Sequence, residues 1–564
     1  MSNVREQVWA LALAGMSIAG CTPEADGREV IADAGETGDG ETGAGDGDGD
    51  SDTGCGDAVG HRALRRLTRN EYEATVRAVF TLDAATWTGS SLIPDASVEG
   101  YNTNAAALTV DEDYAASLLA SSEAVADLVT ESPRFEQLLP CAVDPGAGLD
   151  CADAYLERFG RLLYRRPLAP EERERYVALI ESILVDADLR AAIHTATVAL
   201  LNSPHFVYRQ ELGQLDGDRY ALDAWELATA LAFTYTGAGP SEGLLDLVEV
   251  GGLDDPEAIA ATVRYLVFDP VSEEVRPEVA AKFFEFGDQW LGLAKLRNMT
   301  KDPIAVPGFD GTIGAAMIDE THALMSAVLF EQRGTVGDLL TAPITVLSPE
   351  LASYYGWGEV VGEQTEVVRP DDWGVGLLAQ GSVLAVSSNN RATSPTQRGL
   401  LVRDRLLCFH PPAPPPGVPT IPPPTPEMTT RERYEQHASD SLCAGCHDYM
   451  DPIGFGFEHL DAGGRFQALD NGQPIDASGV LGALGSPPLD FYGQTELALA
   501  LAAREEPGAC LAEHVAAYSF GLAQTEVGCL VEGPAADLGA GRIGVLDYWM
   551  GLASAPHFRY RDDG

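Results

Sequence analysis

The chain has 564 residues, with 36 basic and 86 acidic side chains, so its formal net charge is −50. This length corresponds to roughly three or four domains, and a hydrophobic content of 45% is enough for large cores. This negative charge argues against binding to nucleic acid or to an anionic membrane surface, because phosphate contacts need clustered lysines and arginines.

Residues 1–21 are predicted to form a lipoprotein signal peptide. Residues 8–18 are apolar or small, a stretch too short to span a bilayer but suited to the core of a signal peptide. The sequence Ile18-Ala19-Gly20-Cys21 is similar to a lipoprotein signal-peptidase box, in which the cysteine becomes the lipidated first residue. We therefore expect an exported protein, lipid-anchored in the cell envelope on its periplasmic or outer-membrane side and touching the membrane only through lipid on Cys21. The alternative is a simple cleaved signal or a free hydrophobic N-terminus.

Residues 22–58 are predicted to be a disordered acidic tether. They contain twelve acidic residues and one base, Arg28, and are otherwise rich in glycine and threonine. Such a segment buries too little apolar surface to offset its loss of chain entropy on folding. We expect it to separate the lipid from the folded body.

The body that follows is predicted to be mainly α, with helical blocks at residues 59–140, 141–215 and 216–355. Thr68 with Glu71, and Asp223 with Glu226, have the spacing of helix capping boxes ahead of apolar residues at helical intervals. Pro170 opens another helix with acids in its first turn. Residues 282–293 are rich in aromatic side chains, and residues 318–330 have the pattern of a further amphipathic helix.

The C-terminal third is predicted to be a connector and two further units. Residues 356–426 form the connector, which ends in a strap at residues 411–426 with ten prolines in sixteen residues, a composition typical of polyproline II. A small α unit at residues 427–485 contains a CxxCH motif and, around Asn471-Gly472, a β-hairpin signal. Residues 486–564 form a last helical block.

The cysteines fit an oxidising compartment. Cys141 and Cys151 bracket a loop containing proline and glycine, and we predict that they form a local disulfide. Cys510 and Cys529 flank one helix-like segment and are the second predicted pair. A disulfide between Cys55 and Cys408 then follows by elimination alone.

The strongest chemical motif is Cys443-Ala444-Gly445-Cys446-His447, the attachment sequence of a c-type haem. Two thiols separated by two residues on one helical turn can reach both vinyl groups of a porphyrin, and the adjacent histidine lies under the iron as its proximal ligand. We therefore predict one covalent haem c on Cys443 and Cys446, with His447 as the metal ligand. A zinc site needs two more ligands at suitable spacing, and a redox dithiol of the thioredoxin type needs a βαβ context.

The sixth ligand of that iron is left open by the sequence. Met450 is a candidate, but it lies three residues beyond His447, one turn away on the same helical face. Other candidates, none supported by spacing, are His459, Met428, His437 and Met550. A vacant or water-bound position, open to peroxide or small ligands, is the remaining alternative.

Residues 61–560 resemble large exported bacterial proteins of the planctomycete type, which are built of five tandem domains of unknown function and carry a cytochrome-c-like segment near the C-terminus. The motifs that carry this resemblance are, in chain order, residues 64–72 (LRRLTRNEY), 164–168 (YRRPL), 201–209 (LNSPHFVYR), 289–293 (QWLGL), 380–382 (QGS), 393–395 (TSP), 398–399 (RG), 443–461 (the CxxCH segment) and 518–522 (YSFGL). The resemblance implies an exported, single-haem architecture without an established activity. Two departures are His459, where the family has Asn, and Leu522, where it usually has Arg.

The sequence thus favours an exported lipoprotein with one c-type haem, acting in redox chemistry or electron transfer with an unknown extracytoplasmic substrate or partner. Because the chain is acidic, a redox or envelope partner is expected to present a basic face. The alternatives are a surface binding or assembly protein with a structural CxxCH, and a haem-dependent enzyme acting on extracellular polymer. No Ser-His-Asp triad, phosphate-binding glycine loop or HExxH helix is recognisable, so catalytic residues stay unassigned.

Overall fold

The computed structural model describes residues 59–144, 146–411, 421–423, 425, 428–482 and 488–562. The predicted signal peptide with Cys21, the predicted tether with Cys55, and most of the proline-rich strap lie outside these residues. Within the described ranges the protein is mainly α, as predicted, with 24 α-helices and a few short strands that pair in five small sheets.

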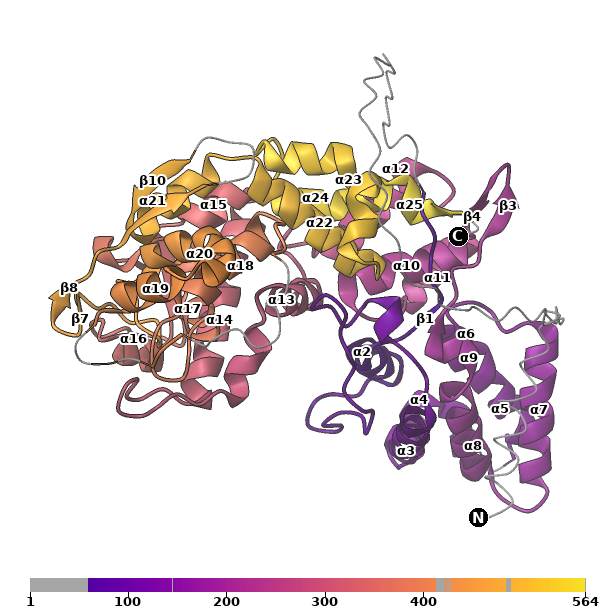
Figure 1. Ribbon diagram of the computed structural model, residues 1–564. Helices are drawn as coiled ribbons and strands as arrows, with labels where there is room; N and C mark the ends of the chain where they lie inside the picture. Colours follow the sequence, from indigo (N-terminus) through magenta and orange to yellow (C-terminus); the bar gives the residue numbers. More distant parts are fainter. Residues whose placement is uncertain are drawn as a thin grey trace, which may run out of the picture.

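The N-terminal lobe is a helical unit with its own hydrophobic core, seen at the lower right in Figure 1. Residues from both predicted blocks, 59–140 and 141–215, share this core. A short antiparallel pair joins the start of the lobe to its end, with Arg65 opposite Arg209. The elements of the lobe are β1 (Arg65–Arg66), α2 (Arg69–Phe80), η1 (Ala105–Ala107), α3 (Glu112–Val129), α4 (Arg134–Leu138), η2 (Pro140–Val143), α5 (Gly148–Tyr155), η3 (Leu156–Gly160), α6 (Arg161–Tyr164), α7 (Pro170–Leu184), α8 (Leu189–Leu201), α9 (Pro204–Val207) and β2 (Tyr208–Arg209).

The predicted helix starts are confirmed by the caps. Thr68 and Glu71 exchange the two hydrogen bonds of a capping box at α2, and Pro170 begins α7. Asp223 and Glu226 form the same kind of capping box at α10 (Ala224–Thr236). These signals are local, because each cap satisfies backbone N–H groups within its own first turn.

A second and larger core joins the middle of the chain to its C-terminal part. The middle contributes β3 (Gln214–Asp216), β4 (Arg219–Ala221), α10 (Ala224–Thr236), α11 (Glu242–Glu249), α12 (Pro256–Val267), α13 (Pro277–Leu291), η4 (Leu293–Asn298), α14 (Gly311–Met325), η5 (Ser326–Glu331), α15 (Val336–Thr341), β5 (Ile344–Leu347), α16 (Pro349–Tyr355), β6 (Thr365–Val368), η6 (Asp371–Trp373), η7 (Leu377–Ala379), α17 (Gly381–Val386) and α18 (Pro395–Leu406). Trp290 in α13 is buried in this core.

The C-terminal part returns to the middle of the molecule. It contributes α19 (Thr430–Ala438), α20 (Ser441–Gly454), η8 (Phe455–Phe457), β7 (Leu469–Asp470), β8 (Gln473–Pro474), β9 (Ser478–Leu481), β10 (Leu489–Tyr492), α21 (Gly493–Ala502), α22 (Glu506–Phe520), α23 (Gln524–Gly539), α24 (Val545–Gly551), η9 (Leu552–Ser554), α25 (Pro556–Arg559) and β11 (Tyr560–Arg561). The last strand, β11, pairs with β4, so the chain end lies beside the β3–β4 hairpin (Figure 1).

The predicted hairpin at Asn471-Gly472 is present as β7 and β8. Both turn residues have positive φ, 48° for Asn471 and 79° for Gly472. That conformation matches the twist of a two-residue hairpin turn and explains why the Asn-Gly pair is a reliable signal.

One helical stretch in the described residues, Gly311–Glu331, is long and apolar enough to cross a membrane by length and composition. It consists of α14 and η5, and 67% of its most apolar window is buried inside the protein. Because its apolar side chains contribute to the larger core, the helix behaves as a central core helix here.

The disulfides confirm one predicted pair and correct the other. Cys141 is bonded to Cys151, as predicted. Cys510 is bonded to Cys408, so the predicted pairing of Cys510 with Cys529 is wrong, and so is the pairing of Cys408 with Cys55. The reason is the tertiary packing: α22 packs against α18, which brings the buried Cys510 beside Cys408, two residues after the end of α18. Cys529 is also disulfide-bonded.

Candidate functional site

The CxxCH helix, α20, is held in place by its crossing with α18. At the crossing, a Cβ atom added to Gly399 of α18 would lie 1.9 Å from the carbonyl oxygen of Met450 in α20. A Cβ atom added to Gly454 would lie at the same distance from the carbonyl oxygen of Pro395. Any side chain at either position would therefore force the helices apart. The Arg398-Gly399 and Thr393–Pro395 motifs of the sequence are thus parts of a scaffold for α20.

The three motif residues lie in the first half of α20. Cys443 is buried and Cys446 is half-buried, and both are free thiols. They lie three residues apart in a helix, so their side chains emerge on neighbouring positions of one face. The side chain of His447 is 14% exposed and lies at the edge of the same face, four residues from Cys443. The structure therefore brings the predicted haem-binding residues together with none of them consumed by a disulfide.

His447 is oriented by a carboxylate that sequence reasoning missed. The Nδ1 atom of His447 donates to Oδ2 of Asp451 over 2.8 Å, and Thr396 of α18 donates to Oδ1 of Asp451 over 2.6 Å. The hydrogen bond that His447 donates to Asp451 raises the pKa of His447, and burial acts in the opposite direction. Because Nδ1 is engaged, Nε2 is the ring nitrogen left for a metal, which is the arrangement that metal-binding histidines usually have.

The signal for this carboxylate was present in the sequence as the i, i+4 spacing of His447 and Asp451. The contribution of Thr396 was not visible, because it depends on where α18 crosses α20.

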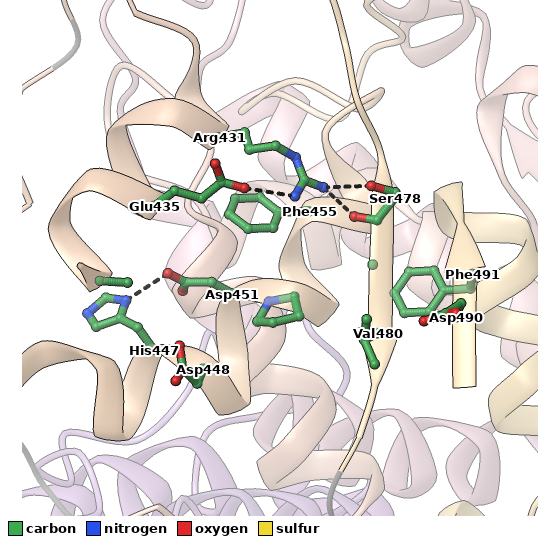
Figure 2. A pocket seen from close by; sticks show the side chains of 13 residues that line it. Arg431, Glu435, His447, Asp448, Asp451, Phe455, Ser478, Val480, Asp490 and Phe491 are labelled. Atoms are coloured by element: carbon green, nitrogen blue, oxygen red, sulfur yellow. Dashed lines mark hydrogen bonds and ion pairs between the residues drawn. The ribbon is translucent and has the colours of Figure 1, made fainter. Parts of the chain in front are cut away.

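A cavity of about 400 Å³ opens beside His447 (Figure 2). In Figure 2, His447 lies at one end of the cavity and Asp490 and Phe491 at the other, with Asp451 between His447 and the centre. The lining combines apolar side chains with one arginine and several carboxylates: Arg431, Glu435, Ala438, His447, Asp448, Asp451, Pro452, Phe455, Ser478, Gly479, Val480, Asp490 and Phe491. A cavity of this size and mixed polarity is typical of cofactor and small-molecule sites.

The segment after the motif packs on protein. A Cβ atom added to Gly456 would lie 2.5 Å from the ring of Phe491, so this glycine permits a close contact between η8 and β10. Phe455 lines the cavity, whereas Phe457 is buried in the core. The glycine after the motif thus permits close packing of protein on protein, and Phe455 contributes an apolar surface to the cavity.

The buried pair Arg398 and Glu458 fixes this segment to α18. Arg398 donates to the carbonyl oxygens of Phe457 and Leu460, and Thr393 donates to Glu458 over 2.7 Å. Burial raises the pKa of Glu458 above the usual range, and the charge of Arg398, 3.7 Å away, opposes that shift.

These donors fit a covalently bound haem. A haem c needs two reduced thiols at i and i+3 and an imidazole with a free nitrogen beside a partly apolar space. Cys443, Cys446 and His447 supply the donors. Of these three residues, His447 is the one that lines the cavity. A zinc site is less well matched, because the one cluster of three metal-binding side chains found in the described ranges is elsewhere, at Cys408, Cys510 and His514. In that cluster both sulfurs are in the Cys408–Cys510 disulfide.

The candidates for a sixth ligand lie in different places. Met450 is buried one turn beyond His447 on the same helix. His459 has its Nδ1 atom 3.2 Å from the carbonyl oxygen of Gln467, and its ring stacks on Phe466. Met550 packs against the larger core, and Met428 precedes α19. His437, near the end of α19, has its ring centroid 4.9 Å from that of His447.

Four segments of the chain match known family models, each described as a protein of unknown function. They are PSD3 (DUF1587) over residues 65–131, PSD5 (DUF1595) over 151–211, PSD4 (DUF1592) over 222–357 and PSCyt3 (DUF1588) over 375–470. The last segment includes α18, α19 and α20.

The chain is therefore a multi-block protein of planctomycete-type domains of unknown function, which confirms that part of the resemblance seen in the sequence. Neither a curated protein nor a solved structure matches the chain.

Proposed function

We propose that this protein carries one c-type haem, attached through thioether bonds to Cys443 and Cys446 and ligated by His447. The observation that carries the proposal is the donor set: two free thiols one helical turn apart, beside an imidazole whose Nδ1 is fixed by Asp451. When bound, the haem supplies a one-electron ferric–ferrous couple.

The residues of this chain then have separate tasks. Cys443 and Cys446 hold the porphyrin, while Asp451 keeps the imidazole of His447 in one tautomer and one orientation. Thr396 holds the Asp451 carboxylate in turn. Phe455, Val480 and Phe491 supply apolar walls that exclude water from one side of the site.

On this basis we propose an exported, lipid-anchored redox protein that transfers electrons to or from an extracytoplasmic partner or substrate. The support for export is the signal-peptide pattern ending at Cys21 and the presence of disulfides such as Cys141–Cys151 and Cys408–Cys510, which are typical of oxidising compartments. The support for a basic-faced partner is the net charge of −50.

The proposal is tested by expressing the protein with a c-type haem maturation system and export to the periplasm. We expect a haem-stained band that survives denaturing electrophoresis and a reduced-minus-oxidised spectrum of c type. Cys443→Ser with Cys446→Ser abolishes both, whereas the matched control Ser439→Ala, just before the same helix, leaves them unchanged. Wild-type protein without covalent haem, in cells that mature another c-type cytochrome, contradicts the proposal.

A haem-dependent enzyme acting on extracellular polymer is the second candidate, and a second cleft of mixed lining favours it. The cleft, of about 560 Å³, lies between α2, the loop at residues 97–102 and α13, and His322 stacks there on Phe284 with ring centroids 4.5 Å apart. His322 is also 2.8 Å from Asp288. The buried Oδ1 of Asn102, another lining residue, has no hydrogen-bond partner in the part of the chain that the structure describes.

Amide, carboxylate and aromatic side chains together suit a ligand rich in hydroxyl groups. Calorimetric titration with soluble cello-, xylo- and chito-oligosaccharides tests this candidate. We expect binding that is lost in Phe284→Ala and kept in the control Phe409→Ala, together with turnover that requires the haem. Binding that survives in Phe284→Ala, or turnover by haem-free protein, counts against it. If a protein partner instead binds Cys443→Ala as tightly as wild type, the CxxCH motif is not needed for a binding or assembly role.

A further inference from the structure

Two histidines from different helices meet beside the CxxCH motif. His437 is in the last turn of α19 and His447 is in α20, and two residues separate these helices. Their ring centroids are 4.9 Å apart, with an angle of 73° between the ring planes. Of the sixth-ligand candidates named by the sequence, His437 is the one that the fold brings into ring contact with His447.

His437 has ring nitrogens that are free to bind. Its side chain is half-buried, and no residue in the described ranges forms a hydrogen bond with its ring. The ring of His447 uses Nδ1 for Asp451 and keeps Nε2. The two rings therefore each retain a nitrogen for a metal ion.

Three of the four other candidates are engaged or wrongly placed. Met450 is on the same helix as His447, where its backbone packs against Gly399, and His459 has its Nδ1 atom against the carbonyl oxygen of Gln467. The carbonyl of Met550 accepts a hydrogen bond from Tyr235 in the larger core. None of the three contacts the ring of His447 in the interactions that the described residues make.

The separation of the rings is close to what one metal ion requires. Metal–imidazole bonds of about 2.0 Å on opposite sides of an ion place two ring centroids roughly 6 Å apart. The observed distance between the ring centroids, 4.9 Å, is about 1 Å shorter. Helix α19 is joined to α20 by a two-residue link at the protein surface, where Glu435, Gln436 and Ser439 are exposed, so a small shift of α19 supplies the difference.

We infer that His437 is the second axial ligand of the haem iron, so that the proposed haem is six-coordinate with two imidazole ligands. This inference rests on the proposed function, because it requires the haem at Cys443, Cys446 and His447. A centre with both axial positions filled by protein has no open position for peroxide or small ligands. It exchanges electrons without binding substrate at the metal.

The test is the spectrum of the purified holoprotein and its variants. We expect wild-type ferric protein to be fully low-spin and without the long-wavelength band of methionine ligation. His437→Gln keeps the covalent haem but becomes high-spin and binds cyanide, and His437→Gly regains the low-spin spectrum when imidazole is added. His437→Met, which offers a different ligand at the same place, acquires the methionine band.

Matched controls are His459→Gln, a half-buried histidine in the same unit, and Met450→Leu, which both stay low-spin. A low-spin spectrum in His437→Gln, or a methionine band in wild type that Met450→Leu removes, overturns the inference and leaves the proposed function intact. Loss of covalent haem from the wild type itself overturns the proposed function instead. Circular dichroism of each variant separates loss of a ligand from loss of the fold.

Discussion

At the scale of single residues, the partner of His447 is the most informative detail. The carboxylate of Asp451 is buried, and it receives one hydrogen bond from His447 and one from Thr396. A histidine that donates to a carboxylate is a more basic ligand, and a more basic ligand favours the more highly charged state of the metal. Asp451 therefore stabilises the ferric over the ferrous iron of the proposed haem.

Replacing Asp451 is expected to raise the reduction potential of the proposed haem. In Asp451→Asn the hydrogen bond to His447 weakens and the negative charge disappears, so we expect an increase on the order of 60 mV, which corresponds to a tenfold change in the one-electron equilibrium. Potentiometric titration of the haem band measures it. The control Asp448→Asn removes a charge next to His447 without removing this hydrogen bond, and an equal increase there would show that charge alone is responsible.

A buried histidine sets a second residue-level expectation. His514 in α22 lies within hydrogen-bonding distance of the hydroxyl of Tyr101, and burial lowers the pKa of His514 to about 3. Between its ordinary value near 6.5 and about 3, the unfolded chain binds a proton at this residue that the folded chain does not. The stability contributed by neutral His514 is therefore complete above pH 6.5 and falls as the pH drops toward 3.

We expect that in His514→Asn the free energy of unfolding decreases less steeply as the pH falls below 6.5. The slope of the unfolding free energy against pH should decrease by up to about 1.4 kcal/mol per pH unit in this window, although the variant is less stable at pH 7 because it packs less well. Urea unfolding at a series of pH values measures the slope. The exposed His410→Asn is the control, and an unchanged slope in His514→Asn would show that His514 does not titrate in this way.

At the scale of elements, the crossing of α18 and α20 explains the site. α18 supplies Thr396 to Asp451, Arg398 to the segment after the motif, and Gly399 to the point of closest approach. The position of the CxxCH helix is therefore set by a helix that begins 48 residues before Cys443.

A methyl group at the crossing is expected to be destabilising. Gly399→Ala places its Cβ against the carbonyl oxygen of Met450, so we expect a loss of about 1–3 kcal/mol in the free energy of unfolding. Gly445→Ala in α20 is the matched control, since nothing lies within 4 Å of the added Cβ. Alanine is the better helix former, so this control should be neutral or slightly stabilising. Thermal unfolding compares the two, and equal melting temperatures would mean that the crossing relaxes freely.

The features that sequence analysis predicted are those encoded within a few residues. The capping boxes at Thr68 and Asp223 and the Asn471-Gly472 hairpin each depend on local hydrogen bonds or local φ values, and the structure confirms them. The Cys408–Cys510 disulfide and the contact of Thr396 with Asp451 were missed, because both depend on how α18 packs against α20 and α22. The ring contact of His437 is of the same kind, since no spacing rule selects it.

At the scale of the whole molecule, the charge governs encounter with other proteins. The net charge of the whole chain is −50, of which −11 lies in residues 22–58 and −39 in the rest of the chain. The candidate site itself is lined by Glu435, Asp448 and Asp490. A field of this sign attracts positively charged surfaces over a distance of about 10 Å at moderate ionic strength.

Electron exchange with soluble redox proteins should therefore depend on salt. Stopped-flow measurement with a small basic cytochrome is expected to give a rate constant that falls steeply as ionic strength rises, and with a small acidic one a rate constant that rises. A rate that is independent of salt with both probes would show that the charge near the haem does not steer association.

The Cys408–Cys510 bond has a consequence for how the protein matures. Its two cysteines are 102 residues apart, and the CxxCH motif lies between them, within the loop that the disulfide closes. Covalent attachment of haem requires reduced thiols, whereas the Cys408–Cys510 disulfide forms only when its two cysteines are oxidised. For the proposed haem to be attached, Cys443 and Cys446 would have to remain thiols in the same chain in which Cys408 and Cys510 are oxidised. The order of these events during biogenesis decides whether the loop closes over a loaded or an empty site.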